Sequence, residues 1–316
     1  MKYLIIKSVL LVLLLASVFA VGRVNSRYEI FAVNRQMNDN NKVGTFRVMT
    51  YNINAPIVDD NIESVKAILI GEINKQSPDI LCLQESSTIF KSIQVSLDSL
   101  FGYTDSMVIK KQPLRYCLYS KKPIRNFKRY KCITEIDATE IDSIKREIRV
   151  IQNGMPVYSA EIEVKPGKWV TVFSCHLRSS AYSTARRSME DDASWMDGLP
   201  IYYANYKLGA RIRNYEADNL RLHLEELEAE GTPIIIAGDF NDWSGSYCMN
   251  TIRNGLYKDA WWEGGFGFGI TYDEWHLKLR IDHILYSQHF ELESVRVDKN
   301  PFSDHYPLVA DFRLIE

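Results

Sequence analysis

Apolar and polar positions in the main part of the chain follow two different periods, which predicts strands and helices in mixed order. Phe46 to Ile53 is rich in apolar and β-branched residues, as strands are. Residues 60–76 place apolar side chains at helical spacing, and Pro78 ends that helix. A second strand is expected over Asp79 to Gln84, and a further helix over Thr88 to Leu100.

The second half of the chain continues in the same way. Three or more strands are expected between Tyr103 and Val164, and another over Lys168 to His176. Residues 180–230 favour helix, and Pro233 to Ala237 is an aliphatic run typical of a buried strand. Short strands and glycine-rich turns then extend to Leu314. The pattern predicts an α/β fold with helices on the outside of sheets.

The N-terminal segment differs from the rest in composition. Residues 1–26 begin with two lysines, continue in an apolar run and end in small residues, which is the layout of a signal peptide. An uncleaved membrane anchor stays open as the other interpretation. Residues 27–44 are polar and predict a linker, and residues 45–316 predict one catalytic domain. We therefore expect a secreted, periplasmic or membrane-anchored protein.

Composition narrows the classes of partner. The net charge is −2 and the pI about 6.3, which argues against a protein that coats long nucleic acid by bulk charge. The cysteines form no CxxC motif, which disfavours a zinc ribbon or a thioredoxin-type site. They are expected to be buried or free thiols. One disulfide, Cys117 with Cys132, stays open for a protein outside the cytoplasm.

Polar residues recur where predicted strands end. Asp239 and Asn241 follow the aliphatic run, Glu85 follows the second strand, Asn52 closes the first, and His176 closes the strand that begins at Lys168. A carboxylate at such a position is a good ligand for a hard cation. Alone, the motif of Asp239 and Asn241 is as typical of a turn as of a site, and a lone strand histidine such as His176 is more often a core residue than a catalyst.

Two further motifs pair carboxylates with histidine near the C-terminus. Strand alternation sends Asp282 to one face and Ile281 and His283 to the other. A buried aspartate is costly unless it is paired, and a histidine that needs orientation would suit it. Asp304 and His305 stand side by side before a predicted strand, and they offer a metal or water ligand next to a general acid or base.

The six motifs, in this order, resemble the endonuclease/exonuclease/phosphatase superfamily from about Phe46 to Phe312. That superfamily includes pancreatic-type deoxyribonucleases, abasic-site endonucleases, bacterial-type sphingomyelinases, inositol polyphosphate 5-phosphatases and deadenylases. The resemblance implies a four-layer sandwich in which two mixed β-sheets lie face to face and are flanked by helices. It places the active site at one edge of the sheets.

The resemblance also implies a metal site for Mg²⁺ or Mn²⁺. Glu85 matches the principal ligand of the family. Asn52 matches a residue that supports the metal and the attacking water, and Asp304 matches a second carboxylate on the metal side.

Five residues match the catalytic positions of the family. Asp239 matches the residue that orients or deprotonates water, and Asn241 the amide that holds the phosphate. His305 matches the histidine at the scissile phosphate, and Asp282 the carboxylate that orients it. His176 matches a second histidine, found in the deoxyribonuclease and sphingomyelinase branches.

The implied reaction is metal-dependent hydrolysis of a phosphodiester by in-line attack of an activated water. The substrate is expected to be a nucleic acid or a phospholipid-type diester. Two alternatives stay open: a phosphomonoesterase for an inositol or sugar phosphate, and a non-catalytic binding module. Ser86 and Ser87 stand where deoxyribonucleases usually place Arg or Lys, and His283 follows Asp282 where inositol 5-phosphatases have Arg.

Three other features bear on substrate and assembly. Residues 110–131 carry many Lys and Arg and no acidic residue, so they could contact nucleic acid, an anionic membrane surface or only solvent. Arg213 is expected to be structural. The Gly/aromatic loop 264–272 is expected either to shape a substrate pocket or to be a flexible turn. We expect a monomer that binds a phosphate ester.

Overall fold

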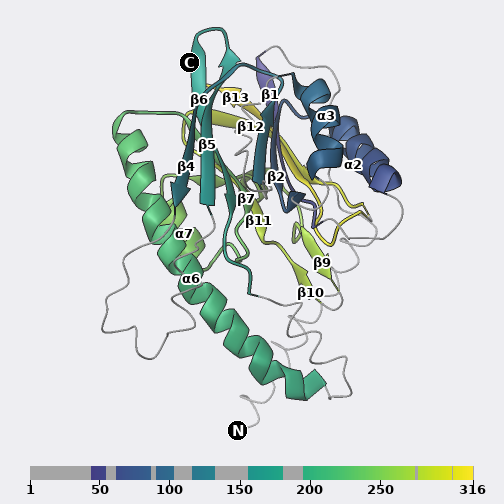
Figure 1. Ribbon diagram of the computed structural model, residues 1–316. Helices are drawn as coiled ribbons and strands as arrows, with labels where there is room; N and C mark the ends of the chain where they lie inside the picture. Colours follow the sequence, from purple (N-terminus) through teal and green to yellow (C-terminus); the bar gives the residue numbers. More distant parts are fainter. Residues whose placement is uncertain are drawn as a thin grey trace.

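The chain forms two face-to-face β-sheets with helices on both outer faces (Figure 1). The computed structural model describes residues 44–54, 62–86, 90–102, 116–131, 156–180, 195–274, 277–300 and 302–315. A five-stranded sheet has the order β12-β13-β1-β2-β3, and a six-stranded sheet the order β4-β5-β6-β7-β11-β8. The two remaining strands, β9 (Tyr272–Glu274) and β10 (Leu277–Leu279), pair as a hairpin.

Both large sheets are mixed, because each contains one parallel pair among antiparallel ones. In the first, β1 runs parallel to β2, and in the second β6 runs parallel to β7. The strands of the first sheet are β1 (Thr45–Asn52), β2 (Ile80–Gln84), β3 (Tyr116–Ser120), β12 (Phe290–Val297) and β13 (Leu308–Leu314). Those of the second are β4 (Ile124–Lys131), β5 (Pro156–Lys165), β6 (Lys168–His176), β7 (Ile234–Asp239), β8 (Lys258–Asp259) and β11 (Asp282–Tyr286).

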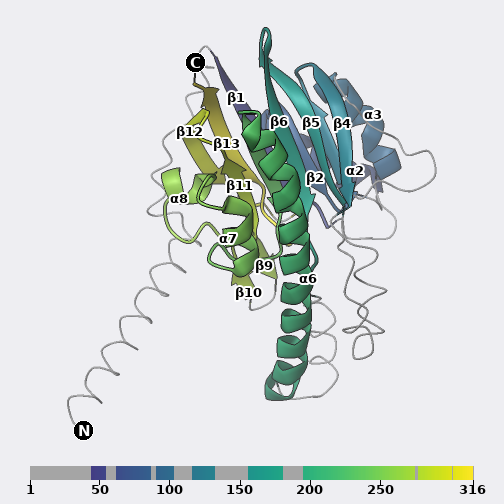
Figure 2. The same ribbon diagram turned by 90° about the vertical axis from the view of Figure 1, so that its left-hand side faces the viewer.

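Helices close the two outer faces of the sandwich. Helices α2 (Ile62–Gln76) and α3 (Phe90–Phe101) cover the five-stranded sheet, and α6 (Trp195–Ala229) and α7 (Tyr247–Arg253) lie against the six-stranded one (Figures 1 and 2). A short helix, α8 (Ala260–Gly264), packs beside β12. The predicted sandwich of two mixed sheets flanked by helices is confirmed.

Side-chain alternation along β1 explains the layering. Phe46 and Val48 point into the core between the sheets, whereas Met49 and Tyr51 point into the layer under α2 and α3. Because successive strand residues face opposite sides, a strand buried on both faces must be apolar throughout. β7 meets this demand, since all six of its residues are buried.

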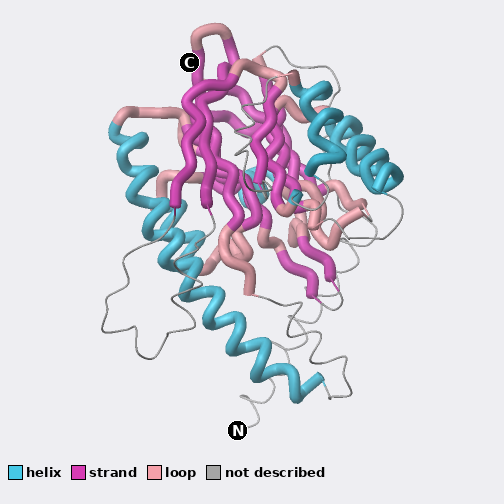
Figure 3. Tube along the Cα trace, in the orientation of Figure 1, coloured by secondary structure: helices cyan, strands magenta, loops and turns pink. Residues whose placement is uncertain are grey.

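Helix α6 is the longest element, with 35 residues. Its C-terminal part packs on the sheet through Ala217, Leu220 and Leu224. Its N-terminal part extends past the ends of the strands (Figures 2 and 3). The helix predicted over 180–230 is thus present from Trp195 onward, and residues 181–194 lie outside the described part of the chain.

Several predictions fall outside the described residues. They are the signal peptide or anchor at 1–26, the linker, and the cysteine pair Cys117–Cys132, whose side chains are not described. Cys82, Cys175 and Cys248 are buried thiols outside any disulfide, as expected of them. Within the described residues, the structure has no helix that is both long and apolar enough to span a membrane.

Candidate active site

The predicted site residues lie together where strands of both sheets end. In the parallel pair β1–β2, Asn52 is level with Gln84, the neighbour of Glu85. In the other parallel pair, His176 at the end of β6 is level with Asp239 at the end of β7. The C-terminal ends of parallel strands share one edge of a sheet, so these side chains converge.

Asp239 is the centre of the cluster and is buried. Its Oδ2 accepts a hydrogen bond from Asn52 Nδ2 at 2.9 Å, which joins the two sheets. Its Oδ1 accepts one from the backbone N–H of Asn241 at 2.8 Å, and Asn241 Nδ2 donates to Oδ2 at 3.1 Å. Burial raises the pKa of Asp239 to about 6, helped by the charge of Asp282 and opposed by the nearby histidines.

Asp282 and His305 form a buried pair. Asp282 is the first residue of β11, and it pairs with Asp239 on the antiparallel neighbour β7. Its Oδ2 lies 2.9 Å from His305 Nδ1, and His305 Nε2 lies 3.8 Å from Asp239 Oδ2. Burial alone would lower the pKa of His305, but the charges of Asp282 and Asp239 outweigh it and raise the pKa to about 10. Tyr272 packs edge-on against the imidazole.

His176 occupies the opposite side of the cluster. Its Nε2 lies 3.5 Å from Glu85 Oε1 and 3.6 Å from Asp239 Oδ2. Burial lowers its pKa, and the charge of Asp239 offsets only part of that effect. The two histidines therefore have pKa values shifted in opposite directions, a pattern found where acid and base roles are divided.

Two site residues have left-handed backbone conformations. Glu85 has a φ of 55° and Asn241 a φ of 52°. Such conformations are uncommon for residues with a side chain and often mark functional turns. Position 238 requires glycine for a steric reason. A Cβ on Gly238 would stand 2.0 Å from the carbonyl oxygen of Cys175 on β6. Only glycine lets β6 and β7 approach closely enough to bring His176 beside Asp239.

Sequence reasoning missed three residues that organise the site. Asn54 donates from Nδ2 to both carboxylate oxygens of Asp304, at 3.1 and 2.9 Å. Ser303 Oγ donates to the Asn52 carbonyl at 3.0 Å. Thr271 Oγ1 accepts hydrogen bonds from the N–H groups of residues 281 and 282 at 3.2 and 3.1 Å. The sequence holds a signal for Asn54, two residues after Asn52, and for Ser303, directly before Asp304.

The donor set fits a hard divalent cation. Asp239, Asp282 and His305 are the group of acidic and histidine residues, within the described chain, whose ligand atoms come within 4.8 Å of one another. Both nitrogens of His305 face carboxylates, however. These three side chains therefore form ion pairs with one another, and the open carboxylate of the site is that of Glu85. Glu85 has a side chain 37% exposed at the open edge, and carboxylate oxygens suit Mg²⁺. Asn52 turns its amide nitrogen toward Glu85, at 3.2 Å from Oε1.

A second buried network supports the site from behind. Arg213 of α6 is fully buried, with its Nε 3.0 Å from Asp242 Oδ2 and Nη1 2.9 Å from Ser180 Oγ. It fastens α6 to the loop that follows Asn241, as expected of a structural residue. On the far face of β11, His283 Nδ1 lies 3.0 Å from Asp259 Oδ2.

The basic stretch 110–131 is described only in part. On β4, Arg125, Lys128 and Arg129 are exposed, and Arg125 pairs with Glu161 at 2.8 Å. The arginine also lies over the ring of Trp169, with its Cζ 3.9 Å from the ring centroid. Residues 110–115 lie outside the described chain.

The chain thus combines a two-sheet sandwich with carboxylate–histidine pairs at one edge. The model of the Endonuclease/Exonuclease/phosphatase family matches residues 49–305, and the chain belongs to that family. Its members are generally metal-dependent phosphoesterases. A search of curated protein sequences finds no match.

Solved structures agree on the fold. The human Nocturnin catalytic domain with bound sulfate is 20% identical, with a TM-score of 0.59 over 86% of this chain and 94% of that one. TDP2 from C. elegans is 17% identical, with a TM-score of 0.57 over 93% and 80% of the two chains. A family protein from Bacteroides thetaiotaomicron is 14% identical, with a TM-score of 0.58 over 86% and 98%.

Proposed function

We propose that the protein hydrolyses phosphodiester bonds with the help of Mg²⁺ or Mn²⁺. The observation that carries this proposal is the convergence of Asp239, His305 and His176 beside the open carboxylate of Glu85. A nucleophile activator, two imidazoles and a hard-cation ligand are the groups that this hydrolysis needs.

Glu85 would hold the metal ion, with Asn52 Nδ2 3.2 Å from its Oε1, and Asp304, held by Asn54, would supply a second carboxylate. Bound there, the ion would neutralise charge on the phosphoryl oxygens. Among the described atoms, Asp282 Oδ1 is buried without a hydrogen-bond partner, so that carboxylate keeps a free acceptor in the site. We place Asp282 with His305 and not with the metal, because its other oxygen is already bonded to the imidazole.

Asp239 is the proposed base. Its Oδ2 receives the proton of the attacking water while the water oxygen bonds to phosphorus. Asn52 and Asn241 hold the carboxylate in place with three hydrogen bonds. A base is most effective when its pKa lies near the working pH, and the raised pKa of Asp239, about 6, meets that condition.

His305 is the proposed acid. The bond from phosphorus to the leaving oxygen breaks, and that oxygen takes a proton from the imidazolium. The carboxylate of Asp282 stabilises the positive charge of the ring, so His305 is protonated near neutral pH. We propose that His176, with its lowered pKa, donates a neutral N–H to a phosphoryl oxygen, and that the Asn241 amide contacts the phosphate.

The experiment is an assay of the purified protein with Mg²⁺ against bis-p-nitrophenyl phosphate and p-nitrophenyl phosphate. Turnover of the diester and not of the monoester supports the proposal. Preference for the monoester would favour a phosphomonoesterase, and turnover of neither would contradict catalysis of this kind.

We further propose, from residues 1–26 alone, that the protein acts outside the cytoplasm.

A further inference from the structure

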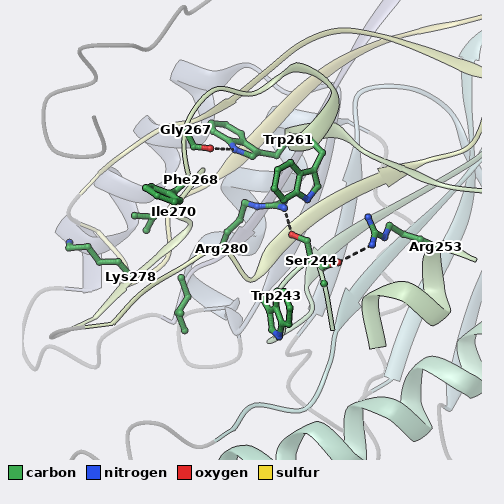
Figure 4. A pocket seen from close by; sticks show the side chains of 12 residues that line it. Trp243, Ser244, Arg253, Trp261, Gly267, Phe268, Ile270, Lys278 and Arg280 are labelled. Carbon is green, nitrogen blue, oxygen red and sulfur yellow. Dashed lines mark hydrogen bonds between the residues drawn. The ribbon is translucent and has the colours of Figure 1, made fainter. Parts of the chain in front are cut away.

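A cavity of about 630 Å³ adjoins the loop after Asn241, helix α8 and the β9–β10 hairpin (Figure 4). Its apolar walls are mainly aromatic. The side chains are Trp243, Trp261, Trp262, Phe268, Ile270 and Leu279. Gly267, Phe268 and Ile270 of the loop 264–272 line this cavity, and its role in binding substrate stays a prediction.

Glycines hold two of the indoles in place. A Cβ on Gly245 would stand 2.2 Å from the ring of Trp243, and one on Gly269 would stand 2.3 Å from the ring of Trp261. Trp261 Nε1 also donates to the carbonyl of Gly267 at 3.1 Å. Both indoles thus lie directly on backbone, which fixes them before any ligand arrives and reduces the entropy lost on binding.

Part of the aromatic surface is open to solvent. Trp243 is 59% exposed, Trp262 68% and Phe268 46%. Large apolar surface left exposed next to a polar site commonly marks a place where a ligand binds.

The polar part of the lining is positively charged. Among the described residues, the lining contains Arg253, Lys278 and Arg280 and no carboxylate. Lys278 pairs with Asp273, and Arg280 pairs with Asp259. Arg253 bonds to the neutral oxygens of residues 244, 249 and 250 and to no carboxylate within the described chain, so its charge favours an anionic ligand.

Segments that line the pocket continue along the chain into the catalytic cluster. Trp243 lies two residues after Asn241, and Arg280 lies two residues before Asp282. Ile270 precedes Thr271, whose hydroxyl accepts the amide hydrogen bond of Asp282. A ligand in the pocket would therefore lie beside the segments that carry Asn241 and Asp282, and a phosphate attached to it would extend from there toward the cluster.

We propose that this pocket binds a nucleobase of the substrate, which makes the substrate a nucleotidyl phosphodiester. The inference rests on the proposed function. Flat aromatic walls and guanidinium groups stack on planar rings, and Arg280 already lies over the ring of Trp262, 5.4 Å from its centroid. Among the described lining residues, an acyl chain would find two aliphatic side chains, Ile270 and Leu279.

The test compares two diesters that release the same p-nitrophenolate. One is the p-nitrophenyl ester of thymidine 5′-phosphate, and the other is the matching ester of a deoxyribose 5′-phosphate that lacks the base. We expect kcat/KM to be about 10-fold or more higher for the ester with the base, as stacking of one base gives roughly 5- to 150-fold. Trp243→Leu and Trp262→Leu should each bring this ratio toward one.

The matched control is Trp169→Leu, on β6. That indole also carries a guanidinium, that of Arg125, but it lines no part of this pocket. The ratio should therefore be unchanged in this variant. Circular dichroism and unfolding curves check that all three variants fold.

The outcomes separate the pocket from the reaction. Equal turnover of both esters would overturn the inference and leave the proposed function standing. Faster turnover of sphingomyelin that depends on Trp243 and Trp262 would also overturn it, in favour of a lipid. If no diester is cleaved, the proposed function fails. Quenching of tryptophan fluorescence by thymidine 5′-monophosphate, lost in Trp262→Leu, would then still support the pocket, and absence of quenching would overturn it.

Discussion

Among single residues, Asp239 is the one on which the proposed hydrolysis depends most. Asp239→Asn keeps the size of the side chain and removes the proton acceptor. We expect kcat on a diester to fall by roughly 10²- to 10⁴-fold, the usual range for loss of a positioned base. Steady-state kinetics measure this. Glu291→Gln, an exposed carboxylate on β12, is the control and should keep full turnover. Full turnover in Asp239→Asn would remove Asp239 from the mechanism.

The pair Asp282–His305 predicts a pH dependence. A group that acts as an acid is active when protonated, so activity falls as pH rises through its pKa. The pKa of His305 is raised to about 10, with Asp282 the main cause after the opposing effect of burial. In Asp282→Asn the alkaline limb of the pH–rate profile should move to lower pH, and the maximal rate should fall. An unmoved alkaline limb would show that another group supplies the proton.

At the scale of elements, Gly238 fixes the contact of β6 and β7. In Gly238→Ala the new Cβ would overlap the Cys175 carbonyl, which stands 2.0 Å away. We expect a loss of about 3 kcal/mol in unfolding free energy, at the upper end of overpacking costs. Gly71→Ala on α2, with nothing within 4 Å of its Cβ, should instead gain about 0.5–1 kcal/mol. Urea unfolding compares them, and equal effects would contradict the clash.

The start of β11 depends on a buried charge. Asp259 Oδ2 accepts from Arg280 Nη1 at 2.9 Å and lies 3.0 Å from His283 Nδ1. Burial would raise the pKa of Asp259, but His283 and Arg280 hold it well below its usual range. A carboxyl with a depressed pKa stabilises the fold above its unfolded pKa, about 4, and loses that contribution as the pH falls below it.

Asp259→Asn should therefore destabilise the protein by about 3 kcal/mol at pH 7, since Arg280 is left without its partner. The gap to the wild type should narrow as the pH falls from about 4 toward 2. Thermal or urea unfolding at several pH values measures both. Asn keeps a side-chain oxygen at the N-cap of α8, so the cap is retained. A gap that does not change with pH would show that the charge is not the cause.

Elements buried on both faces were the most predictable from sequence. β6 has the predicted bounds, and β7 begins one residue after the predicted start, because a run such as Ile234–Ala237 can only be a buried strand or core helix. The same pattern placed polar residues at strand ends, and the family resemblance gave those residues their expected roles. The contact of Asn54 with Asp304 could not be predicted, because those residues are 250 positions apart. The walls of the pocket could not be predicted either, because only folding brings Trp243 and Trp262 to the same cavity.

At the scale of the whole molecule, the sandwich brings two half-sites together. Asn52 ends β1 and Glu85 directly follows β2, whereas β6, β7 and β11 carry His176, Asp239 and Asp282. The bond from Asn52 to Asp239 crosses between the sheets. Neither sheet alone holds both the proposed metal ligand and the proposed base. The site is therefore complete only when the two sheets are packed together.

Removal and return of the metal ion test most directly whether the protein is a metal-dependent phosphodiesterase. Purified protein is treated with EDTA, dialysed and assayed on bis-p-nitrophenyl phosphate while Mg²⁺ or Mn²⁺ is added back. We predict that EDTA abolishes turnover, that either ion restores it, and that Glu85→Gln raises the ion concentration needed for half-maximal rate. Full turnover in EDTA, or a Glu85→Gln variant with an unchanged ion requirement, would contradict the account.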